Sequence, residues 1–97
     1  MSKTIFEKII SKEIPANIHH EDDDLIVIDD INPAAPIHLL IIPKKKIETL
    51  NDLTDKDTNL VGKMFQTAKD MALKLGIDKS GYRTIFNCNE DGGQTVY

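Results

Sequence analysis

A single long helical pattern covers residues 54–75 and limits the folds open to this chain of 97 residues. Thr54 is placed to cap its start, and Gly76 follows as the expected stop. Apolar side chains recur at helical spacing along one face, at Leu60, Val61, Met64, Phe65, Ala68, Met71, Ala72 and Leu75. Other apolar groups must shield a stripe this wide from water. The sequence leaves open whether the chain's own sheet covers it or a second copy shares it in a dimer.

The residues before this helix predict a short helix followed by a β-hairpin. Thr4 and Glu7 form a capping box, and Pro15 is expected to end the helix that begins there, because the residue before a proline disfavours helical geometry. Two β-prone runs follow, at Ile18–Glu21 and Leu25–Asp29. The three aspartates between them indicate the turn of a hairpin.

Two further strands are predicted. Residues 37–42 are apolar on both faces, so they should form a strand in the middle of a sheet, and Pro43 should end it. Residues 83–87 should form another strand, followed by a turn-rich loop at residues 89–93. The order of helix, three strands, long helix and strand indicates an α+β fold with an antiparallel sheet.

The last four residues are β-prone. Gln94, Thr95, Val96 and Tyr97 leave the glycine loop as though a further strand begins there. A sheet without its partner strand leaves backbone groups unpaired, at ~1–3 kcal/mol for each buried group. We therefore expect residues 1–97 to form one domain that is incomplete at its carboxyl end.

Charge and composition exclude several functional classes. A net charge of −4 argues against a nonspecific nucleic-acid binder, and the three lysines at 44–46 are too few to change this. The single cysteine, Cys88, excludes an internal disulfide, and no spacing of histidine and cysteine indicates a metal site. No secretory apolar run opens the chain, and the apolar stretch at 37–42 is far shorter than a membrane span. The sequence predicts a cytoplasmic protein without metal, cofactor, nucleic-acid partner or membrane anchor.

Three segments carry polar groups suited to a ligand. Asp29 and Asp30 follow a predicted strand, where a carboxylate can accept from both hydroxyls of a ribose, or they form a solvated turn pair. His38 is either a core histidine or a functional base. Residues 92–95 offer backbone N–H groups to an anion, or they form a plain hairpin turn. No serine or cysteine has a neighbouring base, so the residues alone indicate no nucleophile.

Six spaced blocks, at residues 5–16, 21–23, 30–38, 42–45, 81–83 and 91–97, carry a family resemblance. They include Ile5-Phe6 with Pro15-Ala16, Ala35-Pro36-Ile37-His38, and Asp91-Gly92-Gly93-Gln94. Together they resemble the histidine-triad (HIT) family, its Hint branch in particular, over nearly the whole chain. The resemblance implies a HIT-like sheet, a homodimer, and a hydrolase of purine nucleoside phosphoramidates. Such a hydrolase releases a nucleoside monophosphate through a nucleotidyl-histidine intermediate.

The resemblance also implies a role for each site residue. Asp30 should hold the ribose hydroxyls of a purine nucleotide, and His38 should orient the nucleophilic histidine through a hydrogen bond. Apolar side chains should line the purine cleft, namely Phe6, Ile9, Ile28 and Ile31. Polar groups should face the phosphate, namely Asn87, Gly93, Gln94 and Thr95. Family members often carry an aromatic residue where Ile28 stands, so the base preference is open.

In that family the nucleophilic histidine lies directly after the segment that matches Tyr97. The 97 residues should therefore form a nucleotide pocket that is catalytically inactive by itself. The alternative is a non-catalytic nucleotide-binding or protein-interaction module. The coding sequence after Tyr97 distinguishes the two.

Overall fold

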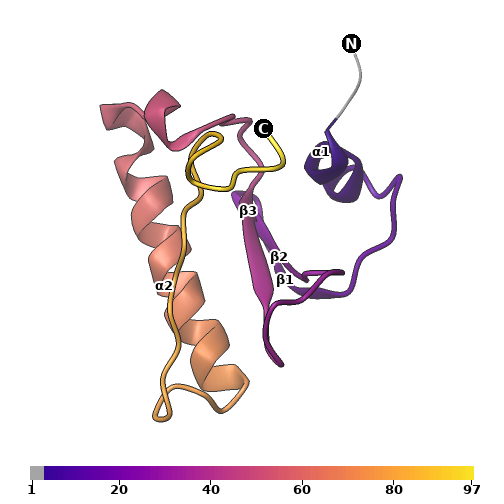
Figure 1. The fold of residues 1–97 in the computed structure, drawn as a ribbon, viewed down its shortest axis with the longest axis vertical. Coiled ribbons are helices and arrows are strands. Elements are labelled where there is room, and N and C mark those ends of the chain that lie inside the picture. Colours follow the sequence, from indigo (N-terminus) through magenta and orange to yellow (C-terminus); the bar gives the residue numbers. More distant parts are fainter. Residues whose placement is uncertain (1–3) are drawn as a thin grey trace. The chain divides into compact units, whose positions relative to one another are not determined.

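The computed structural model describes residues 4–97, which divide into two compact units (Figure 1). The first contains the described residues up to Lys46 together with Val96 and Tyr97, and the second contains Ile47–Thr95. The first unit holds a short helix and the sheet, and the second holds the long helix. Together they form the α+β fold that the sequence predicts. No helix within residues 4–97 has the length and apolar character needed to cross a membrane.

Helix α1 spans Ile5–Ile10, and its predicted capping box is confirmed. The Glu7 N–H donates to the Thr4 hydroxyl, and the Thr4 N–H donates to the Glu7 carboxylate, both at 3.1 Å. The prediction that Pro15 ends the helix is wrong, because the helix already stops at Ile10. Lys12 adopts the left-handed conformation, with φ 67°, and this reverses the chain. The N–H groups of Glu13 and Ile14 then donate to the carbonyl of Lys8, at 2.9 and 3.2 Å.

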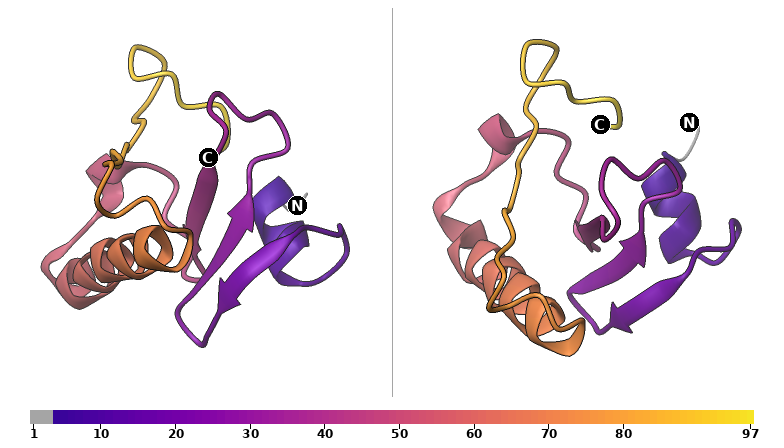
Figure 2. Two further views of the ribbon diagram at one scale, coloured as in Figure 1. Left: turned by 90° about the horizontal axis from the view of Figure 1, so that it is seen from below. Right: turned by 60° about the horizontal axis from the view of Figure 1, so that its bottom comes forward.

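The sheet contains β1 (Ile18–Glu21), β2 (Leu25–Asp29) and β3 (Leu39–Pro43), antiparallel and in that order (Figure 2). The predicted hairpin and its acidic turn are confirmed. The Asp22 carboxylate explains the turn: it accepts from the N–H groups of Asp24 at 2.8 Å and Leu25 at 3.1 Å. A side chain that replaces a backbone acceptor in this way is a common means of closing a turn.

The third strand differs from its prediction in bounds and in position. It begins at Leu39 rather than residue 37, includes Pro43, and lies at the edge of the sheet in the described part of the chain. Ile37 is outside it and 41% exposed. The central strand is β2, of which Leu25, Ile26, Val27 and Ile28 are buried. An edge strand tolerates Pro43, since a proline has no N–H to give to a second neighbour.

Helix α1 and one face of the sheet enclose the core of the first unit. Four buried isoleucines form its centre, namely Ile9, Ile26, Ile28 and Ile42. Five partly buried apolar residues surround them, namely Phe6, Ile10, Ile14, Ala16 and Leu40. Ile26 and Ile28 are two residues apart on β2, so they point to the same face. The apolar side chains of Phe6, Ile9 and Ile10 therefore anchor α1 to the sheet.

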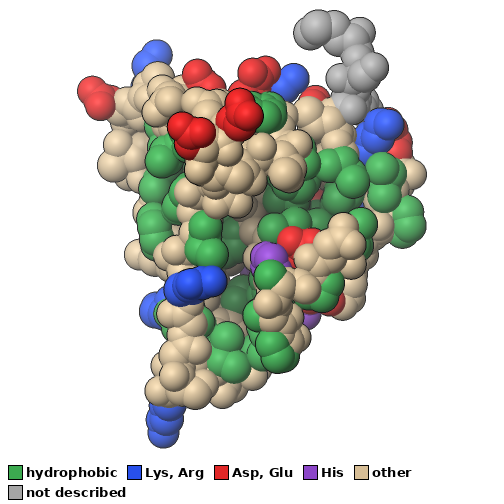
Figure 3. Space-filling model, viewed as in Figure 1, with side chains coloured by type: hydrophobic (Ala, Val, Ile, Leu, Met, Phe, Trp, Pro, Cys, Tyr) green, Lys and Arg blue, Asp and Glu red, His purple; other side chains and the backbone are tan. Residues whose placement is uncertain are grey.

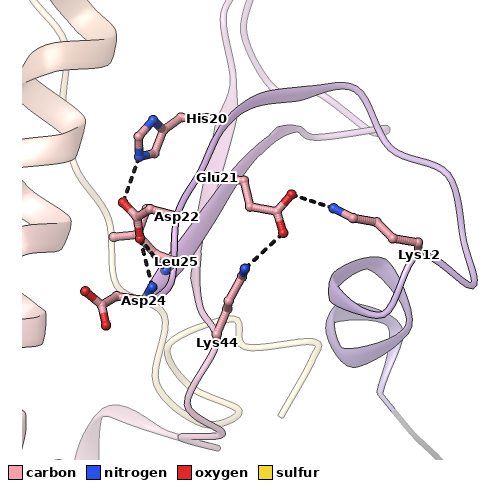
Figure 4. Close-up of polar contacts among 7 residues, drawn as sticks. All are labelled: Lys12, His20, Glu21, Asp22, Asp24, Leu25 and Lys44. Atoms are coloured by element: carbon pink, nitrogen blue, oxygen red, sulfur yellow. Dashed lines mark hydrogen bonds and ion pairs between the residues drawn. The ribbon is translucent and has the colours of Figure 1, made fainter.

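Two lysines hold the Glu21 carboxylate at the end of β1 (Figure 4). Lys12 Nζ lies 2.5 Å from Oε1, and Lys44 Nζ lies 3.0 Å from Oε2. Lys12 comes from the turn after α1 and Lys44 from the end of β3. Their hydrogen bonds lower the pKa of Glu21, that of Lys12 more than that of Lys44. The two ion pairs connect the end of β1, the turn after α1 and the end of β3 at the surface of the unit.

The second unit contains the long helix where the sequence predicts it. The 3₁₀ helices η1 (Leu50–Asp52) and η2 (Asp55–Asp57) precede α2, which spans Thr58–Lys74. Thr54 does cap the helical segment, but it caps η2, so the first turn is 3₁₀ rather than α. Gly76 follows the end with φ 74°, as expected of a helix stop.

The apolar stripe of α2 is only partly covered. Met71 and Ala72 are buried, whereas Phe65 remains 47% exposed. The ring centroid of Phe65 lies 5.7 Å from the ring centroid of Phe86. The extended segment after Gly76 runs back along α2 in Figures 1 and 2. Hydrophobic side chains are visible at the surface over this region (Figure 3).

The prediction of a strand at residues 83–87 is wrong for the structure described here. The backbone is extended in the drawing, but no strand is assigned there, nor at residues 94–97. Ile85 is 63% exposed and Phe86 43% exposed. A strand exists only where a neighbouring backbone takes up its hydrogen bonds, and none pairs with this segment within residues 4–97. Propensity for β structure cannot replace that partner.

Candidate nucleotide site

Asp30 and His38 face each other where β2 leads into β3. In the antiparallel register Asp29 pairs with Leu39, so the next pair outward is Asp30 with His38. The Asp30 N–H donates to the His38 carbonyl at 3.0 Å. Their side chains meet on the same side, with His38 Nε2 3.4 Å from Asp30 Oδ2. The structure thus brings together two of the residues that the sequence singles out.

The loop between them is organised around these two side chains. Asp30 Oδ1 accepts from the N–H of Asn32 at 2.8 Å, and His38 Nδ1 accepts from the N–H of Ala34 at 2.9 Å. Two prolines, at 33 and 36, have no N–H to satisfy. The Asp30 and His38 side chains keep 21% and 33% of their surface exposed. Part of each polar group therefore remains available to a ligand.

Asp29 belongs to a second polar cluster, which the sequence interpretation missed. His19 Nε2 donates to Asp29 Oδ1 at 2.7 Å, and the Asn17 side-chain amide donates to Oδ2. These bonds lower the pKa of Asp29, and the bond from His19 contributes more than the bond from Asn17. The register shift in β1 between Ile18 and His20 lies beside His19. The hairpin pairing places residues 17–20 opposite 27–29 and could have indicated this contact.

The four residues expected to line a purine cleft do not share one environment. Phe6, Ile9 and Ile28 lie together in the core of the first unit, where Ile28 is only 2% exposed. Ile31 is outside this cluster, in the loop after β2, and is 80% exposed. Their role toward a base stays a prediction.

The predicted phosphate residues lie in the loop at the end of the second unit. The Gln94 side chain braces this loop: Oε1 accepts from the Asn89 N–H at 2.8 Å, and Nε2 donates to the Glu48 carbonyl at 2.5 Å. Asn87, Gly93 and Thr95 are exposed. These residues share one loop, and their role toward phosphate stays a prediction.

Two glycines allow the loop to close. A Cβ at Gly92 would lie 2.5 Å from the carbonyl oxygen of Cys88, which is far inside contact distance. Gly93 has φ 76°, a conformation that other residues rarely adopt. The Gly-Gly pair is thus explained by the backbone of the loop, whatever it binds.

Other reactive groups are sparse in the described part of the chain. Residues 4–97 contain no cluster of three or more His, Cys, Asp or Glu side chains placed to hold a metal ion. Cys88 is a free, half-buried thiol.

Comparisons with known proteins place the chain in a family. The family model described as "Scavenger mRNA decapping enzyme C-term binding" matches residues 3–97. A purine nucleoside phosphoramidase of Escherichia coli (strain K12) is 45% identical over 95 residues, which is 98% of this chain and 80% of that protein. An uncharacterised HIT-like protein of Buchnera aphidicola is 41% identical over 96 residues, 99% of this chain and 86% of that protein.

Solved structures agree with these sequence matches. A HIT family hydrolase of Legionella pneumophila superimposes with a TM-score of 0.96 at 46% identity, over 98% of this chain and 85% of that one. A histidine triad protein of Clostridium difficile gives a TM-score of 0.92 at 40% identity, over 99% and 85%. The fold and the sequence lead to one conclusion: this chain belongs to the histidine-triad family.

Proposed function

We propose that this chain supplies the nucleotide site for the hydrolysis of purine nucleoside phosphoramidates, a reaction that releases the nucleoside monophosphate. The proposal is supported by its 45% identity to the purine nucleoside phosphoramidase of E. coli. The observation that carries it is the Asp30–His38 pair, a carboxylate and an imidazole 3.4 Å apart at a partly exposed loop.

Asp30 is proposed to bind the ribose. An ionised carboxylate has about four lone-pair sites. The Asn32 N–H occupies one of them, on Oδ1, which leaves room for the two hydroxyls of a cis-diol. Hydrogen bonds to a charged acceptor contribute ~1.5–3 kcal/mol each, enough to anchor a nucleoside.

The remaining roles follow the family resemblance. We propose that Phe6, Ile9, Ile28 and Ile31 favour a purine, and that the loop with Asn87, Gly93, Gln94 and Thr95 holds the phosphate through N–H donors. The partly covered stripe of α2, with Phe65 exposed, supports a homodimer.

The proposed reaction has two displacements at phosphorus. A histidine nitrogen attacks, the P–N bond of the phosphoramidate breaks, and the amine leaves with a proton. Water then cleaves the nucleotidyl-histidine to give the monophosphate. The nucleophile of this mechanism is none of the chain's three histidines, His19, His20 and His38. We therefore expect no turnover from a polypeptide of residues 1–97 alone, since loss of a nucleophile lowers rates by ~10⁶-fold.

Calorimetry with AMP tests the binding part of the proposal. Asp30→Ala should weaken AMP binding at least about tenfold, the loss of one charge-assisted hydrogen bond or more. Asp23→Ala is the matched control, since it removes an exposed carboxylate from the β1–β2 turn. Equal dissociation constants for the two variants would remove Asp30 from the site. Adenosine phosphoramidate hydrolysis by the 97-residue polypeptide, above the rate in buffer, would contradict the mechanism.

A further inference from the structure

We infer that His38 is a positioning residue for nucleoside binding: its imidazole fixes the Asp30 carboxylate that receives the ribose. This inference rests on the proposed function and adds a role for His38 in the binding step, separate from any role toward a nucleophile.

The tautomer of His38 follows from the loop. Nδ1 accepts a hydrogen bond from the Ala34 N–H at 2.9 Å, so it carries no proton in this arrangement. A neutral imidazole has one proton, which must then be on Nε2. Nε2 is the atom that lies 3.4 Å from Asp30 Oδ2. The Ala34 backbone therefore turns the donor end of His38 toward the carboxylate.

The two oxygens of Asp30 are fixed by different groups. The Asn32 N–H fixes Oδ1 at 2.8 Å, and the Nε2–H of His38 attracts Oδ2. The separation of 3.4 Å is longer than an ordinary hydrogen bond, so the attraction is moderate. A ribose hydroxyl that binds to Oδ2 can therefore displace this contact. No lysine or arginine within residues 4–97 forms an ion pair with Asp30. His38 is thus the group in the described chain that sets the orientation of Oδ2.

Preorganisation explains why this matters for affinity. A carboxylate on an exposed loop samples several rotamers, and a ligand must select one of them. Holding the side chain beforehand reduces that loss of freedom on binding. The backbone pair of Asp30 and His38, joined at 3.0 Å, keeps the imidazole beside the carboxylate.

The test separates ribose binding from general damage. Binding of AMP and of 2′,3′-dideoxy-AMP is measured by calorimetry for the parent, His38→Asn and His38→Gln. Asn keeps an acceptor near the Nδ1 position but loses the Nε2 donor, whereas Gln places an amide donor near Nε2. We expect His38→Asn to weaken AMP binding about two- to tenfold, the size of one modest hydrogen bond, and to leave the dideoxy ligand unchanged. His38→Gln should recover part of the preference for the diol.

A double-mutant cycle adds an independent check. In the Asp30→Ala background, His38→Asn should change AMP binding no further, because the group that it positions is gone. Equal weakening of both ligands by His38→Asn, or a full effect in the Asp30→Ala background, would overturn the inference.

The ligand preference of the parent and one further readout keep the outcomes distinct. If the parent binds AMP and its dideoxy form equally, the ribose role of Asp30 fails, and with it the proposed function. If the parent prefers the diol and His38→Asn keeps that preference, only the role of His38 fails.

Long-range ¹⁵N–¹H spectra of the unmodified protein need no variant: they should show the Nε2–H tautomer of neutral His38, and an Nδ1–H tautomer would refute the argument.

Discussion

Ile28 offers a direct test of whether the residues expected to contact the purine belong to the core. It is 2% exposed and packs with Ile9, Ile26 and Ile42. Ile28→Val removes one buried carbon at a cost of about 0.5–1.5 kcal/mol, and Ile28→Ala costs about 2–5 kcal/mol because a larger cavity remains. For a domain of this size, 1 kcal/mol corresponds to a shift of about 4–8 °C in Tm. The Ala variant should therefore be close to unfolding at moderate temperature.

Urea unfolding followed by far-UV circular dichroism measures this difference. Ile28→Val should lower the midpoint with the slope unchanged, which marks a loss of stability rather than a change in the unfolded state. Ile31→Val is the matched control, because Ile31 is 80% exposed and the same change there should stay within about 0.5 kcal/mol. Equal midpoints for the two variants would refute the reasoning. So would an Ile28→Val variant of full stability that has lost AMP affinity, since Ile28 would then act in a pocket.

Two further predictions concern the surface and the glycine loop. Lys12 lowers the pKa of Glu21 in the folded state. The ion pair therefore stabilises the protein fully at pH values above the pKa that Glu21 has in the unfolded chain, and this stabilisation is lost as the pH falls through the pKa of Glu21 in the folded protein. Lys12→Ala should raise the pKa of Glu21 measured by NMR, and the stability gap to the parent should close in acid; an unmoved pKa would contradict the contact. Gly92→Ala should destabilise the loop by about 1–3 kcal/mol, because its Cβ would meet the Cys88 carbonyl oxygen at 2.5 Å. Gly62→Ala, where nothing lies within 4 Å, should instead stabilise α2 slightly, and thermal melts of both variants decide whether the sign differs.

Local signals in the sequence predicted most of the secondary structure. The capping box of α1, the hairpin at residues 18–29 and the stop at Gly76 each depend on residues a few positions apart, and each is confirmed. The end of α1 was the exception. Pro15 is a strong stop signal, but Lys12 reverses the chain before it is reached, and a lysine with positive φ has no sequence signature.

The sheet shows where local signals fail. Residues 37–42 and 83–87 are both β-prone, yet the first forms a strand only from Leu39 and the second forms none. The difference lies in partners: β3 pairs with β2 along its whole length, whereas no ladder in the described chain includes residues 83–87. Burial of a strand likewise depends on what lies on each side of it, which the strand's own residues do not encode.

The candidate site was partly predictable from local signals and partly not. That Asp30 and His38 come together follows from the antiparallel turn, because two residues that close a loop between paired strands must be opposite each other. That the imidazole presents Nε2 to the carboxylate does not follow from either side chain. It depends on the N–H of Ala34, which is free to bond a side chain because the loop around it, with prolines at 33 and 36, forms no ladder. Replacing Ala34 by proline would remove that N–H without altering either polar side chain. The Nε2–H preference of His38 should then weaken in the ¹⁵N spectra, and an unchanged tautomer would mean that Asp30 alone is sufficient to set it.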